Sequence, residues 1–352
     1  MKTLQRDQCG GVAIWFALLL PVLLGFAALA VDLARIQLTK VELQNAADAA
    51  ALAGARALTD TGKLSGDYYN WSAAKLAALN VAKKNYANNL THITDANIDT
   101  TVTGYWDLSD NSPLSSKRVH DQTESGVHDT GYVPAVSITI TYFGLKLFFA
   151  PLFNAFRFLN ADFNERNIHA TAIAVAAVPA NGTGMFPMAL SSCIYSIYWN
   201  SATNTPKLDP TTNKAYVINI NSVYSGGCNS GQWTSFSLDK NDVPTIRELI
   251  ANGNSDELKI NDPIWIQPGV KATIYDSVPL NIDVTIPVVD NVTTHSEVPI
   301  VAIAGFHIES VKKTGNPKYV TGYFIDPKIF PSLNPGSGAS SLGALSRPVL
   351  VK

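Results

Sequence analysis

The feature that most constrains this chain is an apolar run near its amino terminus. Residues 12–31 contain no charged or strongly polar side chain. As an α-helix this run would be roughly 30 Å long, which matches the hydrocarbon core of one bilayer. The sequence therefore predicts a single transmembrane helix. Pro21 lies in the middle of the span, where it removes one backbone hydrogen bond and favours a kink.

The helix is predicted to continue well beyond the membrane. Residues 32–57 contain no proline and only one glycine, Gly54, and they are rich in alanine, which has the highest helix propensity. We therefore expect one rod over residues 21–58. Asp32 is the first charge after the span, and two alternatives stand: it pairs with Arg35 one turn further on, or it is a solvated helix end.

One side of this predicted rod carries small residues. Ala46, Ala50, Ala53 and Ala57 follow one another at spacings of four, three and four residues, so they share a face along which another helix could approach closely. Asn45 and Asp48 lie beside that face. Either a helix of another protein contacts it, or the chain's own globular domain covers it.

Three motifs in this region resemble a known family. They are D-Q-C-G-G-V-A at residues 7–13, V-D-L-A-R at 31–35 and L-Q-N-A-A-D-A-A-A-L-A at 43–53. This pattern resembles the amino-terminal module of TadG-like proteins, which belong to the tight-adherence (Tad, or Flp) pilus systems of bacteria. The motif residues are Gly10, Asp32, Leu43, Gln44, Asn45, Ala46, Ala47, Asp48, Ala50 and Ala53. Residues 264–292, 298–313 and 318–324 resemble the carboxy-terminal part of such proteins more loosely.

The resemblance implies a structural or assembly role. We expect a membrane-anchored, minor pilin-like component of a Tad pilus that acts through protein–protein contacts and is not an enzyme. Its implied partners are the inner membrane, pilin-like TadE/TadF-type subunits and the Tad secretion machinery. The alternative is an adhesin-like subunit at the pilus tip, which would link the chain to cell adhesion and biofilm formation.

The charges around the span predict its orientation. Lys2 and Arg6 precede it, which favours a cytoplasmic tail at residues 1–9 and export of the rest to the periplasm. We therefore expect a single-pass protein of the bacterial inner membrane, with surface exposure on the pilus as an open alternative. A cleaved signal peptide, with a site at residues 28–30, competes with this interpretation. The run is longer than a typical signal core, and Gly10 lacks the glutamate that follows a prepilin cleavage site, so we expect an uncleaved anchor.

The remaining chain predicts an α+β fold in which the long helix packs with antiparallel sheet. After the module of residues 10–58, residues 59–179 form an α+β extracytoplasmic domain, with a helix at 69–88 and strands at 97–106, 133–143 and 168–178. A turn-rich boundary follows at 179–184. Residues 180–333 then form a β-rich extracytoplasmic domain, and residues 334–352 a flexible tail whose final P-V-L-V could dock as a strand. The strands expected in the β-rich domain are 216–220, 265–267, 271–275, 282–289, 300–311 and 319–325, with a helix at 245–252.

Two stretches of the exported part need separate comment. Residues 144–163 are intensely apolar but too short to span a membrane, so they are expected either to pack in a core or to form an interfacial helix or partner groove. Cys193 and Cys228 are the only cysteines beyond the span. In an oxidising periplasm they are expected to form a disulfide.

The sequence offers little catalytic or ligand chemistry. A net charge of −2 with 15% charged residues does not suggest nucleic-acid binding. No G-x-S-x-G, Walker loop or dinucleotide fingerprint is present, and the six histidines have no metal-ligand spacing. A periplasmic hydrolase would depend on a lone cysteine and a histidine. We expect no cofactor, no metal and no small-molecule substrate.

Overall fold

The computed structural model describes most of the chain, and the residue contacts divide it into two units. Unit 1 comprises residues 1–50, 79–101 and 138–172, and unit 2 comprises 51–78, 102–137 and 173–352. Several long elements therefore run from one unit into the other. The described residues are 9–60, 69–88, 91–127, 132–151, 164–200, 203, 205–222, 230–237, 242–268, 272–336 and 342–352.

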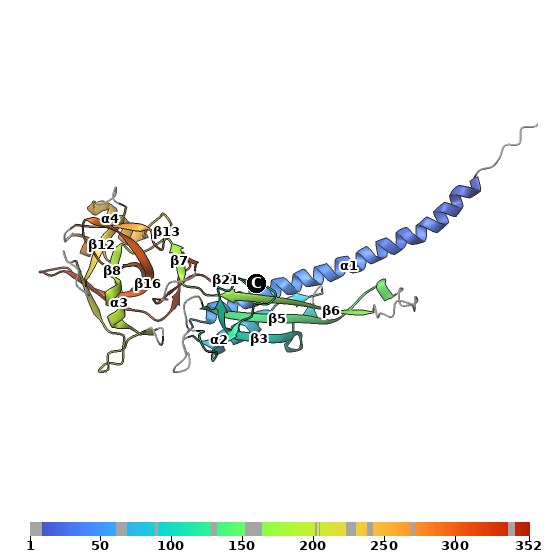
Figure 1. Ribbon diagram of the computed structural model, residues 1–352, viewed down its shortest axis with the longest axis horizontal. Helices are drawn as coiled ribbons and strands as arrows, with labels where there is room; N and C mark the ends of the chain where they lie inside the picture. The colour runs from blue at the N-terminus through green and yellow to red at the C-terminus, as the bar shows by residue number, and fades with distance from the viewer. Residues whose placement is uncertain are drawn as a thin grey trace, which may run out of the picture. The chain divides into compact units, whose positions relative to one another are not determined.

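The predicted rod is a single helix, α1 (Cys9–Ala57), which passes through Pro21 without interruption (Figure 1). Its most apolar 18-residue window has a mean hydropathy of 2.5, and none of that window is buried in the protein. Among the described residues it is the one helix long and apolar enough to cross a membrane. Burial along the helix begins at Asp32, directly after the span.

A five-stranded sheet accompanies α1 and the second helix, α2 (Trp71–Lys83), in the order β21-β6-β5-β3-β4. Residues alternate between the faces of a strand. On β5, Val133 and Ala135 join a core cluster with Trp106, whereas Val136 faces Gly54 of α1. The strands are β3 (Ile98–Asp107), β4 (His120–Asp121), β5 (Tyr132–Lys146), β6 (Glu165–Val175) and β21 (Val349–Leu350).

Unit 2 also contains a closed barrel. Its strands pair in the ring β8-β12-β11-β17-β16-β15, and β15 returns to β8, so each of these six strands has two neighbours. Strand β14 (Pro263–Ile266) bridges β12 and β16. Alternate residues point inward and fill the barrel, among them Trp233, Phe306 and Phe324. The ring strands are β8 (Met188–Ser191), β11 (Ile218–Ser222), β12 (Ser230–Phe236), β15 (Ile282–Val289), β16 (Ser296–Lys312) and β17 (Tyr319–Phe324).

Short elements complete the fold. Helix α4 (Val243–Asn252) starts at Asp242, whose side chain accepts a hydrogen bond from Thr245 N, and it ends at Gly253 with a positive φ of 71°. The others are β1 (Tyr86–Ala87), β2 (Thr91–His92), η1 (Asp95–Asn97), β7 (Pro179–Gly182), α3 (Ser192–Tyr198), β9 (Trp199–Asn200), β10 (Thr205–Pro206), β13 (Leu258–Lys259), η5 (Ile274–Ser277), β18 (Lys328–Ile329), β19 (Leu333–Pro335) and β20 (Ala344–Leu345).

The α+β class, the long helix and most predicted strands are confirmed. The helix expected at 69–88 ends at Lys83, and residues 86–87 instead pair with β2 as strand β1. Two further local predictions need correction. The strand expected at 271–275 is wrong, because Ile274 and Tyr275 open a 3-10 turn and both are buried, whereas alternation would bury only one. The tail expected to be flexible at 334–352 is also different in its described parts. There, β19, β20 and β21 are strands that pair with other strands. The terminal P-V-L-V does dock, through β21 on β6.

Candidate functional site

Asp32 occupies a built site on α1, directly after the apolar span. Its side chain is 2% exposed. The carboxylate accepts hydrogen bonds from three successive backbone N–H groups, those of Phe148 at 2.7 Å, Phe149 at 2.8 Å and Ala150 at 2.6 Å. Successive N–H groups that converge in this way form an anion-binding concavity. The alternative of a solvated helix end is therefore wrong, and the main partner of Asp32 is the turn after β5.

Two opposing effects act on this carboxylate. Burial by itself raises the pKa of Asp32, but the N–H groups of Phe148, Ala150 and Phe149 and the charge of Arg35 lower it, and the net pKa is below the ordinary value. Asp32 is thus ionised at neutral pH, and its charge is satisfied inside the protein. The hydrogen bonds tie α1 to a segment more than a hundred positions away in the sequence.

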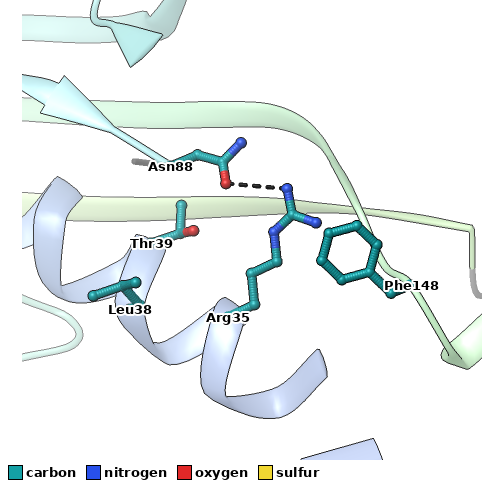
Figure 2. A pocket seen from close by; sticks show the side chains of 5 residues that line it. All are labelled: Arg35, Leu38, Thr39, Asn88 and Phe148. Carbon is teal, nitrogen blue, oxygen red and sulfur yellow. Dashed lines mark hydrogen bonds between the residues drawn. The ribbon is translucent and has the colours of Figure 1, made fainter. Parts of the chain in front are cut away.

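Arg35 extends the same attachment one turn further along α1. One guanidinium nitrogen donates to the carbonyl oxygen of Lys146 at 3.0 Å and the other to Oδ1 of Asn88 at 3.3 Å. The guanidinium also lies over the Phe148 ring, 4.3 Å from its centroid. Figure 2 shows Arg35 reaching from α1 between Asn88 and Phe148, beside a cavity of about 350 Å³ that Leu38 and Thr39 also line.

The L-Q-N-A-A-D-A-A-A-L-A motif faces inward. Leu43, Ala46, Ala47 and Ala50 are completely buried. Beside them, the amide of Gln44 donates to Asp48 Oδ1 at 2.7 Å and to the carbonyl oxygen of Thr171 at 3.3 Å. Of the two alternatives for the small-residue face, coverage by the chain's own domain is confirmed for these positions.

The remaining motif residues are placed differently. Asn45 is exposed and Ala53 is half-buried, whereas Gly10 lies in the first turn of α1. Gly54, one residue after the motif, closely approaches Ala74 and Ala78 of α2 and Val136 of β5. The small side chains therefore let the sheet and α2 pack tightly against α1.

The opposite face of α1 is exposed, and we call Ala34, Leu38, Val41 and Asn45 its outer face. Their spacings of four, three and four residues place them on one side of the helix. Leu38 is 54% and Val41 55% exposed. Sequence reasoning missed this face, because the alanine pattern drew attention to the other side of the helix.

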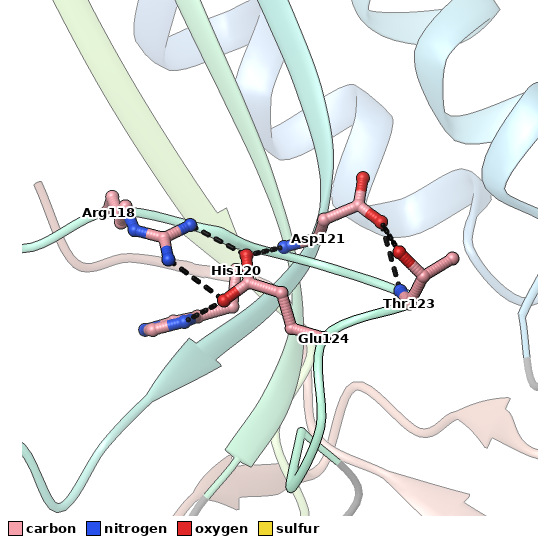
Figure 3. A network of polar contacts seen from close by, with 5 residues as sticks. All are labelled: Arg118, His120, Asp121, Thr123 and Glu124. Carbon is pink, nitrogen blue, oxygen red and sulfur yellow. Dashed lines mark hydrogen bonds and ion pairs between the residues drawn. The ribbon is translucent and has the colours of Figure 1, made fainter.

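A second polar cluster lies around β4 in unit 2. The carboxylate of Glu124 accepts hydrogen bonds from two guanidinium nitrogens of Arg118, at 2.7 and 2.8 Å, and from the backbone N–H of Asp121 at 2.8 Å. His120 Nδ1 lies 3.0 Å from the same carboxylate (Figure 3). Arg118, followed by His120 and the Asp121 N–H, lowers the pKa of Glu124 to about 2. The hydrogen bonds of Glu124 hold residues 118–124 together.

Replacing Arg118 with alanine should raise the pKa of Glu124 from about 2 towards its ordinary 4.5. Because the folded-state pKa is depressed, the contribution of Glu124 to stability is present above pH 4.5 and is lost as the pH falls towards 2. The carboxyl ¹³C shift of Glu124, titrated by NMR, measures the change. Lys117→Ala removes a neighbouring cation that does not contact Glu124 and serves as control. Equal pKa values in both variants would contradict the assignment.

Metal and cysteine chemistry give no further site in the described part of the chain. No group of three His, Cys, Asp or Glu residues suited to a metal ion occurs among the described residues. His307 hydrogen-bonds Asp283 at 2.7 Å, and Asp283 also pairs with Lys328, so this histidine belongs to a surface ion-pair cluster. Cys193 lies in α3, and Cys228 falls outside the described residues.

The Cys193–Cys228 disulfide stays a prediction. Its loop should restrict the unfolded chain by roughly 3–4 kcal/mol in the chain-entropy estimate. Mass spectrometry of peptides prepared without reduction should find the two joined, and Cys193→Ser should lower the melting temperature. A Cys9→Ser variant is the control, because Cys9 precedes the span. Recovery of Cys193 and Cys228 as alkylatable thiols would contradict the pairing.

A long apolar helix that continues into a sheet-packed module defines a membrane-anchored type of α+β protein. Residues 10–57 match the family model described as "Putative Flp pilus-assembly TadE/G-like". Residues 53–174 match the model described as "Putative Tad-like Flp pilus-assembly". The resemblance is thereby confirmed: over residues 10–174 the chain is a TadG-like protein of the Tad system, which is involved in Flp pilus assembly. No curated protein and no solved structure matches the chain.

Proposed function

We propose that the chain is a membrane-anchored, minor pilin-like assembly component of the Flp pilus, and that it acts through protein contacts without catalysis. One observation carries this proposal. Beyond the span, α1 buries its small-residue face in its own domain and leaves the apolar outer face uncovered. Exposed Leu38 and Val41 on a rigid helix are suited to contact a partner.

The partner that fits the outer face is the helix of another membrane-anchored subunit. Ala27 and Leu23, inside the span, lie on the same side of α1 as Ala34, because they precede it by about two and about three helical turns. The uncovered strip therefore runs from the membrane into the exported part. A partner that follows the whole strip must itself cross the bilayer, and pilin-like TadE/TadF-type subunits are the partners that we propose. Small residues such as Ala27 and Ala34 permit close helix contact within lipid.

The same proposal places most of the chain in the periplasm and the tail before the span in the cytoplasm. A phosphatase reporter fused after residue 180 should be active, and a reporter that works only in the cytoplasm should be silent there. The adhesin alternative predicts labelling of the barrel on intact cells. A component confined to the inner membrane and periplasm should remain unlabelled in that experiment.

A charge placed on the outer face tests the contact itself. Leu38→Glu with Val41→Glu should weaken recovery of TadE/TadF-type subunits on the order of 100-fold, because two apolar side chains lose their burial. Piliation should fall while the melting temperature and membrane insertion stay unchanged. Gln37→Glu adds a charge to the same exposed turn beside the strip and is the matched control. Unaltered recovery of the partners by the double variant would overturn the proposed contact.

A further inference from the structure

We propose that the turn after β5 inserts Phe148 and Phe149 into the lipid headgroup region, as a second membrane contact beside the transmembrane helix. The proposal rests on the membrane anchoring of residues 12–31. It concerns the aromatic side chains of the turn, of which Phe148 lines the same cavity as Leu38 of the outer face. Residues 152–163 lie outside the described residues.

The hydrogen bonds to Asp32 fix the depth of this turn. Asp32 directly follows the last apolar residue of the span, Val31, so it lies at the boundary of the hydrocarbon core. The backbone nitrogens of Phe148 and Phe149 are 2.7 and 2.8 Å from its carboxylate. The headgroup layer on each side of the core is about 5–8 Å thick. Both phenylalanines are therefore held within that layer.

The exposure pattern of the turn fits an apolar surrounding. Phe148 is 63% and Phe149 39% exposed, whereas Leu147 and Ala150 on either side are 8% and 5% exposed. The large aromatic side chains thus point outward while the smaller neighbours fill the protein. Phe143, near the end of β5, adds a third exposed ring at 52%. Exposed rings are unfavourable in water, whereas aromatic residues are well suited to the membrane interface.

The cationic side chains near the turn favour a contact with lipid. Lys146 is exposed and Arg35 half-buried, and cations at the interface are attracted to anionic headgroups. The negative charge of Asp32 is enclosed by three N–H groups and does not face outward. Arg35 stacks over Phe148, so a cation and an aromatic ring are presented together. This combination is typical of segments that lie on a membrane surface.

Photo-crosslinking from the helix and the turn measures the depth directly. The full chain is reconstituted into vesicles of phosphatidylethanolamine and phosphatidylglycerol with p-benzoylphenylalanine at one position at a time. Phe148 is the test position, and the change conserves an aromatic ring. Gly25, whose surroundings are open, is the control inside the span. Asn45 is exposed on the same helix roughly 20 Å beyond Asp32 and is the control outside the membrane.

Lipid adducts found by mass spectrometry at positions 148 and 25, with at least tenfold fewer at 45, are the expected result. Adducts at 25 but none at 148 would overturn the proposal and leave the anchor intact. Cross-links from 148 to a second copy of the chain, in place of lipid, would also overturn it and assign the phenylalanines to a protein contact. An absence of adducts at 25 would overturn the anchor itself.

Discussion

Replacing Asp32 with alanine is expected to release the turn after β5 from α1 and to destabilise unit 1 by about 3–5 kcal/mol. The variant leaves three backbone N–H groups without their acceptor, and each such group costs about 1–3 kcal/mol when it stays buried. Amide hydrogen exchange should show loss of protection at Phe148, Phe149 and Ala150. Thermal unfolding of the full chain in detergent provides the second measurement.

Two further variants test whether the loss comes from the hydrogen bonds to Asp32. Asn45→Ala changes an exposed side chain on the same helix and should leave the protection of the turn unchanged. Asp32→Asn keeps one acceptor oxygen and should lose less stability than Asp32→Ala. Full protection of the turn in the alanine variant would mean that the hydrogen bonds to Asp32 do not hold it.

The depressed pKa of Asp32 adds a pH dependence to the same attachment. Its folded-state pKa lies below the ordinary 3.8, so its contribution to stability is fully present above that value and is lost as the pH falls through the folded-state pKa. The unfolding free energy of the native chain should therefore decline below about pH 4 more steeply than that of Asp32→Asn. Parallel declines in the two chains would contradict this linkage.

Gly54→Val should be the second severe substitution, with a loss of about 3 kcal/mol or more from overpacking. A β-carbon at Gly54 would lie 2.8 Å from Val136 Cγ1, 3.0 Å from the carbonyl oxygen of Ala74 and 3.1 Å from Ala78 Cβ. Two of these neighbours are a backbone oxygen and a β-branched side chain, so neither can move away easily. The melting temperature should fall markedly.

Arg56→Val is the matched control for this substitution. It introduces the same β-branched residue two positions along α1, at an exposed site and without the contact. By helix propensity alone Arg56→Val should cost more than Gly54→Val, because arginine is a better helix former than glycine. A larger loss in Gly54→Val must therefore come from the packing of α1 against α2 and β5. Similar melting temperatures in the two would show that this packing can relax.

The sequence predicts the helices and strands themselves, but it does not predict which other segments they contact. The alanine-rich composition after Asp32 predicted α1, and alternation on residues 133–143 predicted β5, because both signals are local. The acceptor role of Asp32 could not be predicted, since its donors are backbone groups 116 to 118 positions away that leave no trace in side-chain composition. The sequence likewise could not predict that the L-Q-N-A-A-D-A-A-A-L-A motif faces inward, because the segments that cover it are distant in the chain.

The strand pairing of the barrel could not be predicted from the sequence either. Strand β15 was predicted from its alternation, but its parallel pairing with β8, about a hundred residues earlier, depends on long-range closure. The parallel pair β11–β12 also joins strands that no hairpin signal connects. Pairing partners of this kind are selected by the fit of the whole core, in which Trp233 and Phe306 occupy the interior.

The barrel is connected to strand β6 at both of its ends. The chain enters the barrel after β6, and residues 349–350, which follow the barrel, pair with β6 as strand β21. Strand β21 pairs with β6 through Val349 and Val175, and the carbonyl oxygen of Lys352 accepts the N–H of Ile173. In chain order the barrel is thus an insertion between neighbouring strands. Tension applied to such an insertion is shared by two covalent links and by the β21–β6 pairing, which would have to separate before the second link could extend.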